Sequence, residues 1–298
     1  MREYTATGND GNMRVDRFIS KLLPSLPAAL IQRAIRQKKV RLNGRHCPAA
    51  ARIAEGDSVR LYFKPEWLEG KPAFSPIAEP NINIVYEDAH LLVADKIAGM
   101  SVHADEHGGA TLIDHALAYL ARSGGWKPDA ENAFKPALCH RIDRNTSGLV
   151  MIAKTHAAQT ILAQKIRDRE LEKRYACKVW GNPGAGVYRD FIRRRPNHSV
   201  VEVFDRPMPE ARTAVTRFET LKFDGEIAEV DCVLETGRTH QIRAQFAFHG
   251  HPLVGDGKYG TLRKGYPKVQ QLRAYSLTFK FTSDAGELGY LDGVTIGN

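Results

Sequence analysis

The sequence has little cysteine and no long apolar segment. Its four cysteines lie far apart among 298 residues, without a C-x-x-C pair, which argues against a zinc ribbon or a disulfide-built fold. The longest purely apolar runs, such as residues 149–153, fall far short of the roughly 20 residues that span a bilayer. The N-terminus lacks the apolar core of a secretory signal. We therefore expect a soluble, reduced, cytoplasmic protein that makes no membrane contact.

Motifs for nucleotides, metals and serine hydrolysis are missing as well. No G-x-G-x-x-G opens a helix after a strand, and no Walker motif occurs. His249 and His251 are two residues apart, whereas metal-binding pairs on a helix prefer a spacing of four, so we interpret them as structural. His140, Asp143 and Ser147 are the residue types of a hydrolase triad, but G-x-S-x-G is absent around Ser147. We expect no cofactor and no metal.

Composition and charge narrow the class of protein and suggest a partner. With 43% hydrophobic and 26% charged residues, the chain is typical of an ordinary globular protein, about two domains long. Its 43 Lys and Arg outnumber 34 Asp and Glu, which gives a net charge of +9. An excess of cations favours a polyanion such as nucleic acid, or an anionic membrane surface, but charge alone does not choose between them.

The pattern along the chain predicts two domains. Residues 1–12 show no periodicity and are predicted to form a flexible tail, and residues 13–63 form a small domain. Residues 64–80 contain four prolines and no clear period, which is typical of a linker. Residues 81–298 mix strands with helices and predict an α+β domain around a mixed, largely antiparallel sheet.

The small domain combines two helices with a hairpin. Apolar residues at three-to-four spacing predict a helix over residues 15–23 and a second one soon after residue 27. Residues 40–42 are predicted to be a strand that ends in the hairpin turn Asn43-Gly44. Six cations lie on the second helix and the hairpin, either as a solvated face or as a surface for nucleic acid: Arg33, Arg36, Lys38, Lys39, Arg41 and Arg45.

Further helices and strands are predicted in the larger domain. Apolar periodicity predicts helices over residues 112–120 and 155–167, and alternation around Tyr175 predicts a strand. Further predicted strands cover residues 82–86, 91–94, 214–218 and 228–234, with a closing strand at 277–281.

The densest polar cluster spans residues 140–148, directly before the apolar run at 149–153. Its single carboxylate, Asp143, lies among Arg141, Arg144 and His140. Cations within about 4–6 Å favour the ionised form of a carboxyl group, and an ionised aspartate can act as a nucleophile or a general base. The alternative is a turn before a strand, in which Asp143 and Arg144 form a structural pair.

A second polar cluster, residues 234–243, follows a predicted strand and contains Arg238, His240 and Arg243. By itself it is equally typical of an exposed loop. The choice between a functional cluster and an exposed loop depends on the other motifs of the chain and on the order in which they occur.

Taken together, the motifs resemble those of two known families. Residues 14–18, the basic helix, residues 40–44 and residues 55–57 resemble the RNA-binding S-four module. The segment HRIDRNTSGL at 140–149 closely resembles the signature of RluA-type RNA pseudouridine synthases. Three more segments match that family in order: residues 84–103, EKRY at 172–175, and GRTHQIR at 237–243 with residues 250–260. Asn145 and Ile97 depart from the family, which often has Asp and Pro there.

The resemblance implies that the chain isomerises uridine within RNA to pseudouridine and needs no cofactor. It implies that Asp143 is the essential carboxylate, which attacks the base, attacks the sugar or removes a sugar proton. Arg243, or else Arg238, is expected to pair with Asp143. Tyr175 is expected to stack on the target base, and Ile242 to pack against the ring.

The remaining expectations concern RNA access and the alternatives. The target nucleotide must be flipped out of its helix, and Arg141 is placed to fill the vacated space, while His140 supports the turn. The expected partner is large-subunit ribosomal RNA, with transfer RNA second, and the expected state is a monomer. The competing hypotheses are a catalytically silent RNA-binding or ribosome-assembly factor and, more distantly, a metal-dependent hydrolase.

Overall fold

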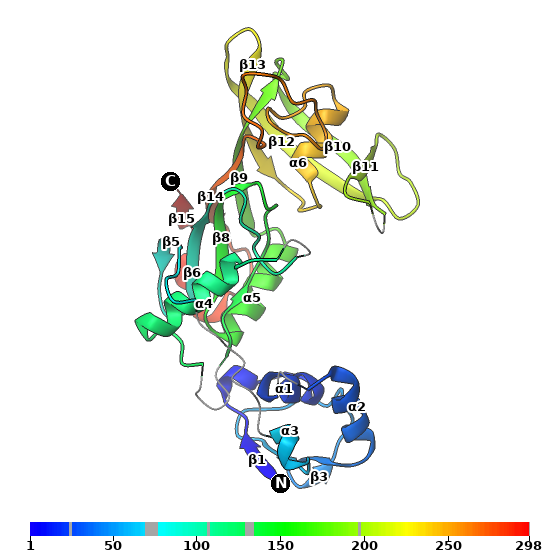
Figure 1. Ribbon diagram of the computed structural model, residues 1–298, viewed down its shortest axis with the longest axis vertical. Coiled ribbons are helices and arrows are strands. Elements are labelled where there is room, and N and C mark those ends of the chain that lie inside the picture. The colour runs from blue at the N-terminus through cyan, green and yellow to red at the C-terminus, as the bar shows by residue number, and fades with distance from the viewer. Residues whose placement is uncertain (24–25, 69–76, 106–107, 129–133, 196–197, 298) are drawn as a thin grey trace.

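The computed structural model describes residues 1–23, 26–68, 77–105, 108–128, 134–195 and 198–297. Within these residues the chain forms a small N-terminal domain with a four-stranded sheet and a larger domain with an eleven-stranded sheet (Figure 1). None of the described helices is long and apolar enough to cross a membrane.

The small domain packs two helices on a sheet with the order β1-β4-β2-β3. Helix α1 (Val15–Leu22) buries Val15, Phe18 and Ile19 completely, which is the apolar face that the sequence predicts. Helix α2 (Ala28–Arg36) runs beside it. Strands β2 (Val40–Leu42) and β3 (Arg45–His46) form a hairpin. Its turn has positive φ at Asn43 (49°) and Gly44 (76°), as a type I′ turn requires.

The predicted flexible tail over residues 1–12 is wrong. Strand β1 (Arg2–Thr5) pairs antiparallel with β4 (Ser58–Leu61) and covers an edge of the sheet that would otherwise be open. Tyr4 is 4% exposed, and a 3-10 helix, η1 (Gly8–Asp10), places the buried Asp10 2.6 Å from Lys21. So short a strand buries only alternate residues, which is too few to show a period in the sequence.

The predicted linker over residues 64–80 is also wrong in its first part. Residues 65–68 form a helix, α3 (Pro65–Leu68), and Trp67 packs edge-on against Phe63 with ring centroids 5.8 Å apart. The prolines that suggested a linker include Pro65, which stands at the first helical position, where proline is well tolerated. Residues 69–76 lie outside the described residues.

The large sheet has the order β11-β10-β12-β13-β9-β14-β8-β6-β5, with β15 beside β14 and β7 beside β8. Its pairs are antiparallel except for β14 and β8, so the mixed, largely antiparallel sheet and the α+β class are confirmed. The strands are β5 (Asn83–Glu87), β6 (Leu91–Lys96), β7 (Ala137–Leu138), β8 (Ser147–Ala153), β9 (Leu171–Trp180), β10 (Ala185–Arg194), β11 (Val201–Phe204), β12 (Arg212–Phe223), β13 (Ile227–Leu234), β14 (Leu272–Phe279) and β15 (Thr295–Gly297).

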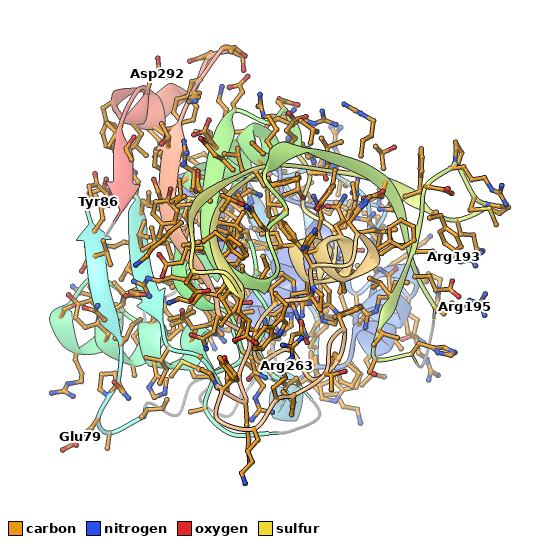
Figure 2. All side chains as sticks on the ribbon, turned by 90° about the horizontal axis from the view of Figure 1, so that it is seen from above. Glu79, Tyr86, Arg193, Arg195, Arg263 and Asp292 are labelled. Atoms are coloured by element: carbon orange, nitrogen blue, oxygen red, sulfur yellow. The ribbon has the colours of Figure 1, made fainter. Side chains whose placement is uncertain are left out.

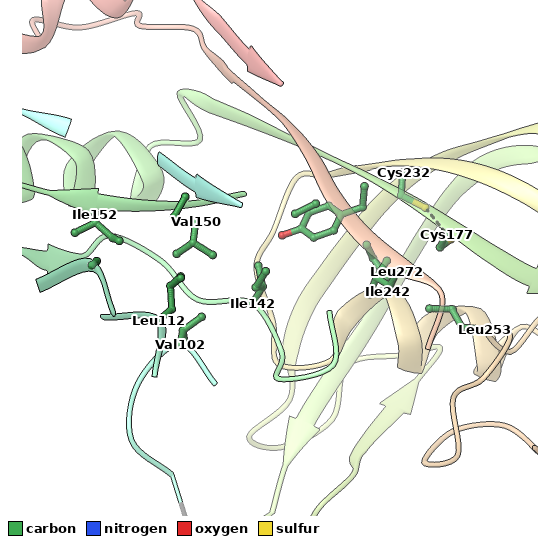
Figure 3. Close-up of a cluster of buried hydrophobic side chains, with 14 of the residues drawn as sticks. Val102, Leu112, Ile142, Val150, Ile152, Cys177, Cys232, Ile242, Leu253 and Leu272 are labelled. Atoms are coloured by element: carbon green, nitrogen blue, oxygen red, sulfur yellow. Dashed lines mark hydrogen bonds between the residues drawn. The ribbon is translucent and has the colours of Figure 1, made fainter. Parts of the chain in front are cut away.

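Strand β8 explains why the apolar run after the polar cluster has no alternation. Leu149 and Met151 pack with helix α5 (His156–Arg167), whereas Val150 and Ile152 pack with helix α4 (Leu112–Ser123) on the other face (Figure 3). A strand covered on both faces is apolar at every position. The run therefore lies in the centre of the domain, and the loop before it starts from a rigid base.

Two features of this domain differ from the sequence prediction. The strand predicted to close the domain, at residues 277–281, overlaps β14 only at residues 277–279, and β14 is inserted between β9 and β8 in the middle of the sheet. The hairpin of β10 and β11 was not predicted. It carries Arg193 and Arg195, which Figure 2 shows at the margin of the molecule. A 3-10 helix, η2 (Gly286–Leu291), precedes the last strand.

Candidate active site

The two polar clusters of the sequence meet at one open groove of about 1250 Å³. The loop before β8 brings Asp143 to this groove, β9 brings Tyr175, and helix α6 (Gln241–Phe248) brings Ile242 and Arg243. A smaller pocket of about 550 Å³ also includes Asp143 and Arg243 in its wall. Asp143 and Arg243, which are 100 positions apart in the sequence, therefore share one site.

The loop that carries Asp143 is held by a buried lysine. Lys96 is 1% exposed, and its ammonium group donates to three backbone carbonyls, those of Ile97, Met100 and Arg144. Burial lowers the pKa of Lys96 to about 8, although the charges of Asp143 and Asp95 act in the opposite direction. The bonds to Ile97 and Met100 hold the turn after β6, and the bond to Arg144 ties this turn to the residue next to Asp143.

Arg243 lies between two carboxylates and is 5% exposed. Its Nη1 donates to Oδ2 of Asp143 at 2.8 Å, while Nε and Nη2 donate to the two oxygens of Asp256 at 2.7 and 2.9 Å. Asp256 is itself 2% exposed and accepts from the backbone N–H of Lys258. The bidentate pair fixes the guanidinium plane, so Arg243 in turn fixes Asp143. Oδ1 of Asp143 forms no hydrogen bond with a described residue.

His240 stands on the other side of Asp143, in a conformation uncommon for histidine. It precedes α6 with φ of 55°, and its Nε2 lies 3.9 Å from Oδ2 of Asp143. The hydroxyl of Tyr259 accepts from the backbone N–H of Val201 and contacts Nδ1 of His240 at 2.8 Å. The Tyr259 hydroxyl keeps a proton that it can donate to Nδ1, and in that tautomer of His240 the ring proton is on Nε2, facing Asp143. Burial lowers the pKa of His240 to about 4, so the ring is neutral at pH 7.

Tyr175 and Ile242 form the apolar wall of the site. They are 7% and 3% exposed, and both belong to the core cluster that contains Leu272 and Cys177 (Figure 3). Burial and then the charge of Asp143 raise the pKa of Tyr175, so its phenol stays protonated. Its hydroxyl forms no hydrogen bond with a described residue, which leaves it available to a ligand.

The remaining predicted site residues take different positions. Arg141 is exposed at the rim and contacts His103 at 3.2 Å. His140 contacts the backbone carbonyl of Leu149 on β8 at 3.3 Å. Arg238 does not contact Asp143: its Nε donates to the carbonyl of Thr213. Of the two arginines considered as partners of Asp143, the structure therefore pairs Arg243.

The six cations predicted to bind RNA gather on one domain. Arg33 and Arg36 lie at the exposed face of α2, Lys38 follows the helix, and Arg45 lies on β3. Lys39 and Arg41 are half-buried, and Arg41 lies over the ring of Tyr62 at 5.4 Å. None of the six forms an ion pair with any residue that the structure describes.

The sequence interpretation assigned no role to Asp256, His240, Tyr259 or Lys96, although all four stand within its motifs. The signal available for Asp256 was its place between Gly255 and Gly257 in the motif at residues 250–260, which did not indicate an ion pair. His249, interpreted as structural, stacks on Tyr188 at 3.9 Å and contacts Asp190. Nowhere in the described ranges do three His, Cys, Asp or Glu side chains gather as a metal site.

This fold and this site define an RNA-modifying enzyme, and comparison with known proteins gives its family. Residues 90–248 match the RNA pseudouridylate synthase family, and residues 13–59 match the S4 domain. The chain belongs to the RNA pseudouridine synthases, of the RluA type with an N-terminal S4 domain. It is accordingly an isomerase that converts uridine in RNA to pseudouridine.

Curated relatives extend over most of the chain. It is 33% identical to the ribosomal large subunit pseudouridine synthase C of Vibrio vulnificus, over 92% of this chain and 86% of the relative. It is 34% identical to an uncharacterized RNA pseudouridine synthase of Chlorobaculum parvum, over 83% and 75%. The solved structure of human RNA pseudouridylate synthase domain containing 1 shares the fold, with a TM-score of 0.55 and 22% identity over 71% of this chain and 83% of that one.

Proposed function

We propose that Asp143 is the single catalytic carboxylate of this enzyme and that it acts on a uridine flipped out of structured RNA. The observation that carries the proposal is the clamp on one oxygen of Asp143. Arg243 holds Oδ2 at 2.8 Å and is itself held by Asp256, while Oδ1 has no partner among the described residues, and Asp143 lines the groove. A carboxylate fixed in this way presents one oxygen to a substrate without further reorganisation.

The apolar wall supports a role for Tyr175 and Ile242 in holding the base. A protonated phenol beside a buried isoleucine offers a flat surface and one hydrogen-bond donor, which suits a uracil ring. The reaction breaks the bond from the sugar to the uracil nitrogen and forms a bond from the same sugar carbon to carbon 5 of the base. The base must turn in place between these steps, and a surface with few polar groups permits that rotation.

The base must be flipped out to reach its wall in the site, because Tyr175 and Ile242 are buried, at 7% and 3% exposed. The atoms that react are hidden in an RNA helix, and extruding a nucleotide costs a few kcal/mol. Arg141 lies at the rim beside both pockets and forms no ion pair with a described residue, so it is free to occupy the space that the base leaves. The exposed cations of the small domain add phosphate contacts that hold the rest of the RNA.

Large-subunit ribosomal RNA is the target we propose. Relatives that cover most of this chain carry that substrate in their names, including synthase C of Vibrio vulnificus and synthase D of Nitrosomonas europaea. The test is to incubate the protein with separate ribosomal and transfer RNA fractions from a strain that lacks the gene, and then to map pseudouridine. We expect new pseudouridine in the large-subunit RNA, and modification of transfer RNA alone would contradict the proposed target.

The Asp143→Asn variant tests the catalytic role. We expect it to form no detectable pseudouridine while its RNA dissociation constant stays within about threefold of the wild-type value, because asparagine keeps the size of the side chain but not its charge. Asp205→Asn is the matched control, since it removes an exposed carboxylate outside the groove. Normal turnover by Asp143→Asn would disprove the assignment.

A further inference from the structure

Lys173 is one of several cations that line the groove, and it has no partner within the described part of the chain. It lies on β9, is half-buried and lines the groove, but forms no hydrogen bond or ion pair with a described residue. The carboxylates beside it are already paired. Glu172 accepts from Lys280, and Glu235 lies 3.0 Å from Arg217.

A half-buried ammonium group without a carboxylate partner costs free energy, because its charged form is partly dehydrated. Burial lowers the pKa of Lys173, and no neighbouring carboxylate offsets that effect. Buried lysines in folded proteins are normally paired, because the charged form loses its hydration without compensation. No described residue supplies a counter-ion to Lys173, and the groove gives a bound anion access to it.

The position of Lys173 indicates which part of an RNA it meets. Side chains two residues apart on a strand point to the same face, about 6.7 Å from each other, so Lys173 lies on the same face as Tyr175 but one step away from it. Gly237 lies beside the ammonium group: a β-carbon there would stand in ordinary van der Waals contact with Nζ, at 3.7 Å. When a base stacks on Tyr175, the sugar and phosphate attached to that base reach Lys173, one step away on the same face of β9.

We propose that Lys173 is a positioning residue that binds a backbone phosphate next to the flipped uridine. This inference rests on the proposed function, because it takes Tyr175 as the site of the base. The ion pair with a phosphate would provide the missing counter-charge and hold the RNA strand beside the flipped uridine.

The test compares Lys173→Met with Lys173→Arg and with the control Lys178→Met. Lys178 lies on the same strand but is half-exposed, paired with Glu229 and outside the groove, so its variant matches the loss of charge. We expect Lys173→Met to raise KM for a ribosomal RNA transcript about tenfold with little change in kcat, and to reduce the slope of log affinity against log salt by about 0.7–0.9. Lys173→Arg should recover most of the loss, and Lys178→Met should behave as the wild type.

A second measurement identifies the phosphate. Transcripts in which single phosphates near the target are replaced by neutral methylphosphonates are bound to the Asp143→Asn protein, with and without Lys173→Met. We expect one replacement to weaken binding only while Lys173 is present. If every replacement affects both proteins equally, or if Lys173→Met lowers kcat at unchanged KM, the phosphate role is wrong. Failure of the wild-type protein to modify any RNA would instead contradict the proposed function, which this binding assay does not require.

Discussion

Arg243 connects Asp143 to Asp256 and stays charged in a buried position. Burial by itself would lower the pKa of Arg243, but its bonds to the two carboxylates outweigh burial and raise it, so the guanidinium group stays charged. Its bidentate pair with Asp256 fixes the guanidinium plane from which the third bond reaches Asp143.

The Asp256→Asn variant should separate fixed geometry from charge. Asparagine loses one of the two bonds to Arg243, so the guanidinium plane is no longer fixed, and a misplacement of about 1 Å can cost about a hundredfold in rate. We expect kcat to fall 10- to 100-fold and the free energy of unfolding to fall by about 3 kcal/mol. Single-turnover kinetics and denaturant unfolding measure the two effects.

The matched control for Asp256→Asn is Asp231→Asn. Asp231 accepts hydrogen bonds from Arg174 and Tyr275 but does not line the groove. Its variant should lose stability and keep the wild-type kcat. Equal losses of kcat in both variants would show that Asp256 acts only through stability.

Gly148, the second residue of β8, has no room for a side chain. Its φ is 113°, and a β-carbon there would lie 2.0 Å from the carbonyl oxygen of Ala274 on β14. We expect Gly148→Ala to lower the free energy of unfolding by more than about 3 kcal/mol, since both the backbone conformation and the contact with β14 oppose it. Gly99→Ala, also at positive φ (91°) but facing open space, should cost about 1–2 kcal/mol. Thermal unfolding of the two variants provides the comparison, and equal losses would contradict the steric argument.

At the scale of elements, the site is built where three of them meet. β8 begins just after Asp143, β9 carries Tyr175, and α6 carries Arg243, while β14 joins β8 to β9. Because β8 is buried on both faces and β14 is central, these elements are among the least mobile parts of the domain. The basic helix α2 of the small domain is a separate element, for which we propose a different task, contact with the RNA backbone.

The role of α2 predicts a specific dependence on salt. Replacing Arg33 and Arg36 by Gln removes two exposed cations that have no carboxylate partner among the described residues. We expect weaker RNA binding and a slope of log affinity against log salt reduced by about 1.4–1.8, measured by filter binding.

The control for α2 removes two cations that are already paired. Arg14 pairs with Asp16, and Arg60 pairs with Glu3, so replacing both by Gln changes the net charge by the same amount. The salt slope of this control should change little. A similar slope in the two variants would show that net charge, and not α2, sets the affinity.

The whole molecule should lose stability in mild acid. Burial lowers the pKa of His140 to about 3, with the charge of Lys173 as a second cause, and burial lowers the pKa of His240 to about 4. Unfolded histidine has a pKa of about 6.5. The unfolded chain therefore binds protons below pH 6.5 that the folded protein rejects, so stability is full above that pH and falls as pH decreases towards 4.

Each histidine contributes a slope of at most about 1.4 kcal/mol per pH unit between its two pKa values. We expect the free energy of unfolding to fall by about 2–3 kcal/mol from pH 6 to pH 5 through these two groups, measured by urea unfolding. The His140→Gln variant should lose roughly half of this pH dependence. An unchanged slope in that variant would mean that His140 can accept a proton within the folded protein.

The sequence by itself determined the elements that have strong periodicity and the motifs that carry chemistry. Helices α1, α4 and α5 and the buried strand β8 follow from apolar patterns, and Asp143, Tyr175 and Arg243 stand in motifs whose order already indicated the family. Tertiary structure decided what depends on contacts between distant residues: the pairing of β1 with β4, the insertion of β14 into the centre of the sheet, and the choice of Arg243 over Arg238 as the partner of Asp143. The physical reason is that a local pattern reports which face of an element is buried, but an ion pair such as that of Arg243 with Asp256 depends on where the chain returns in space.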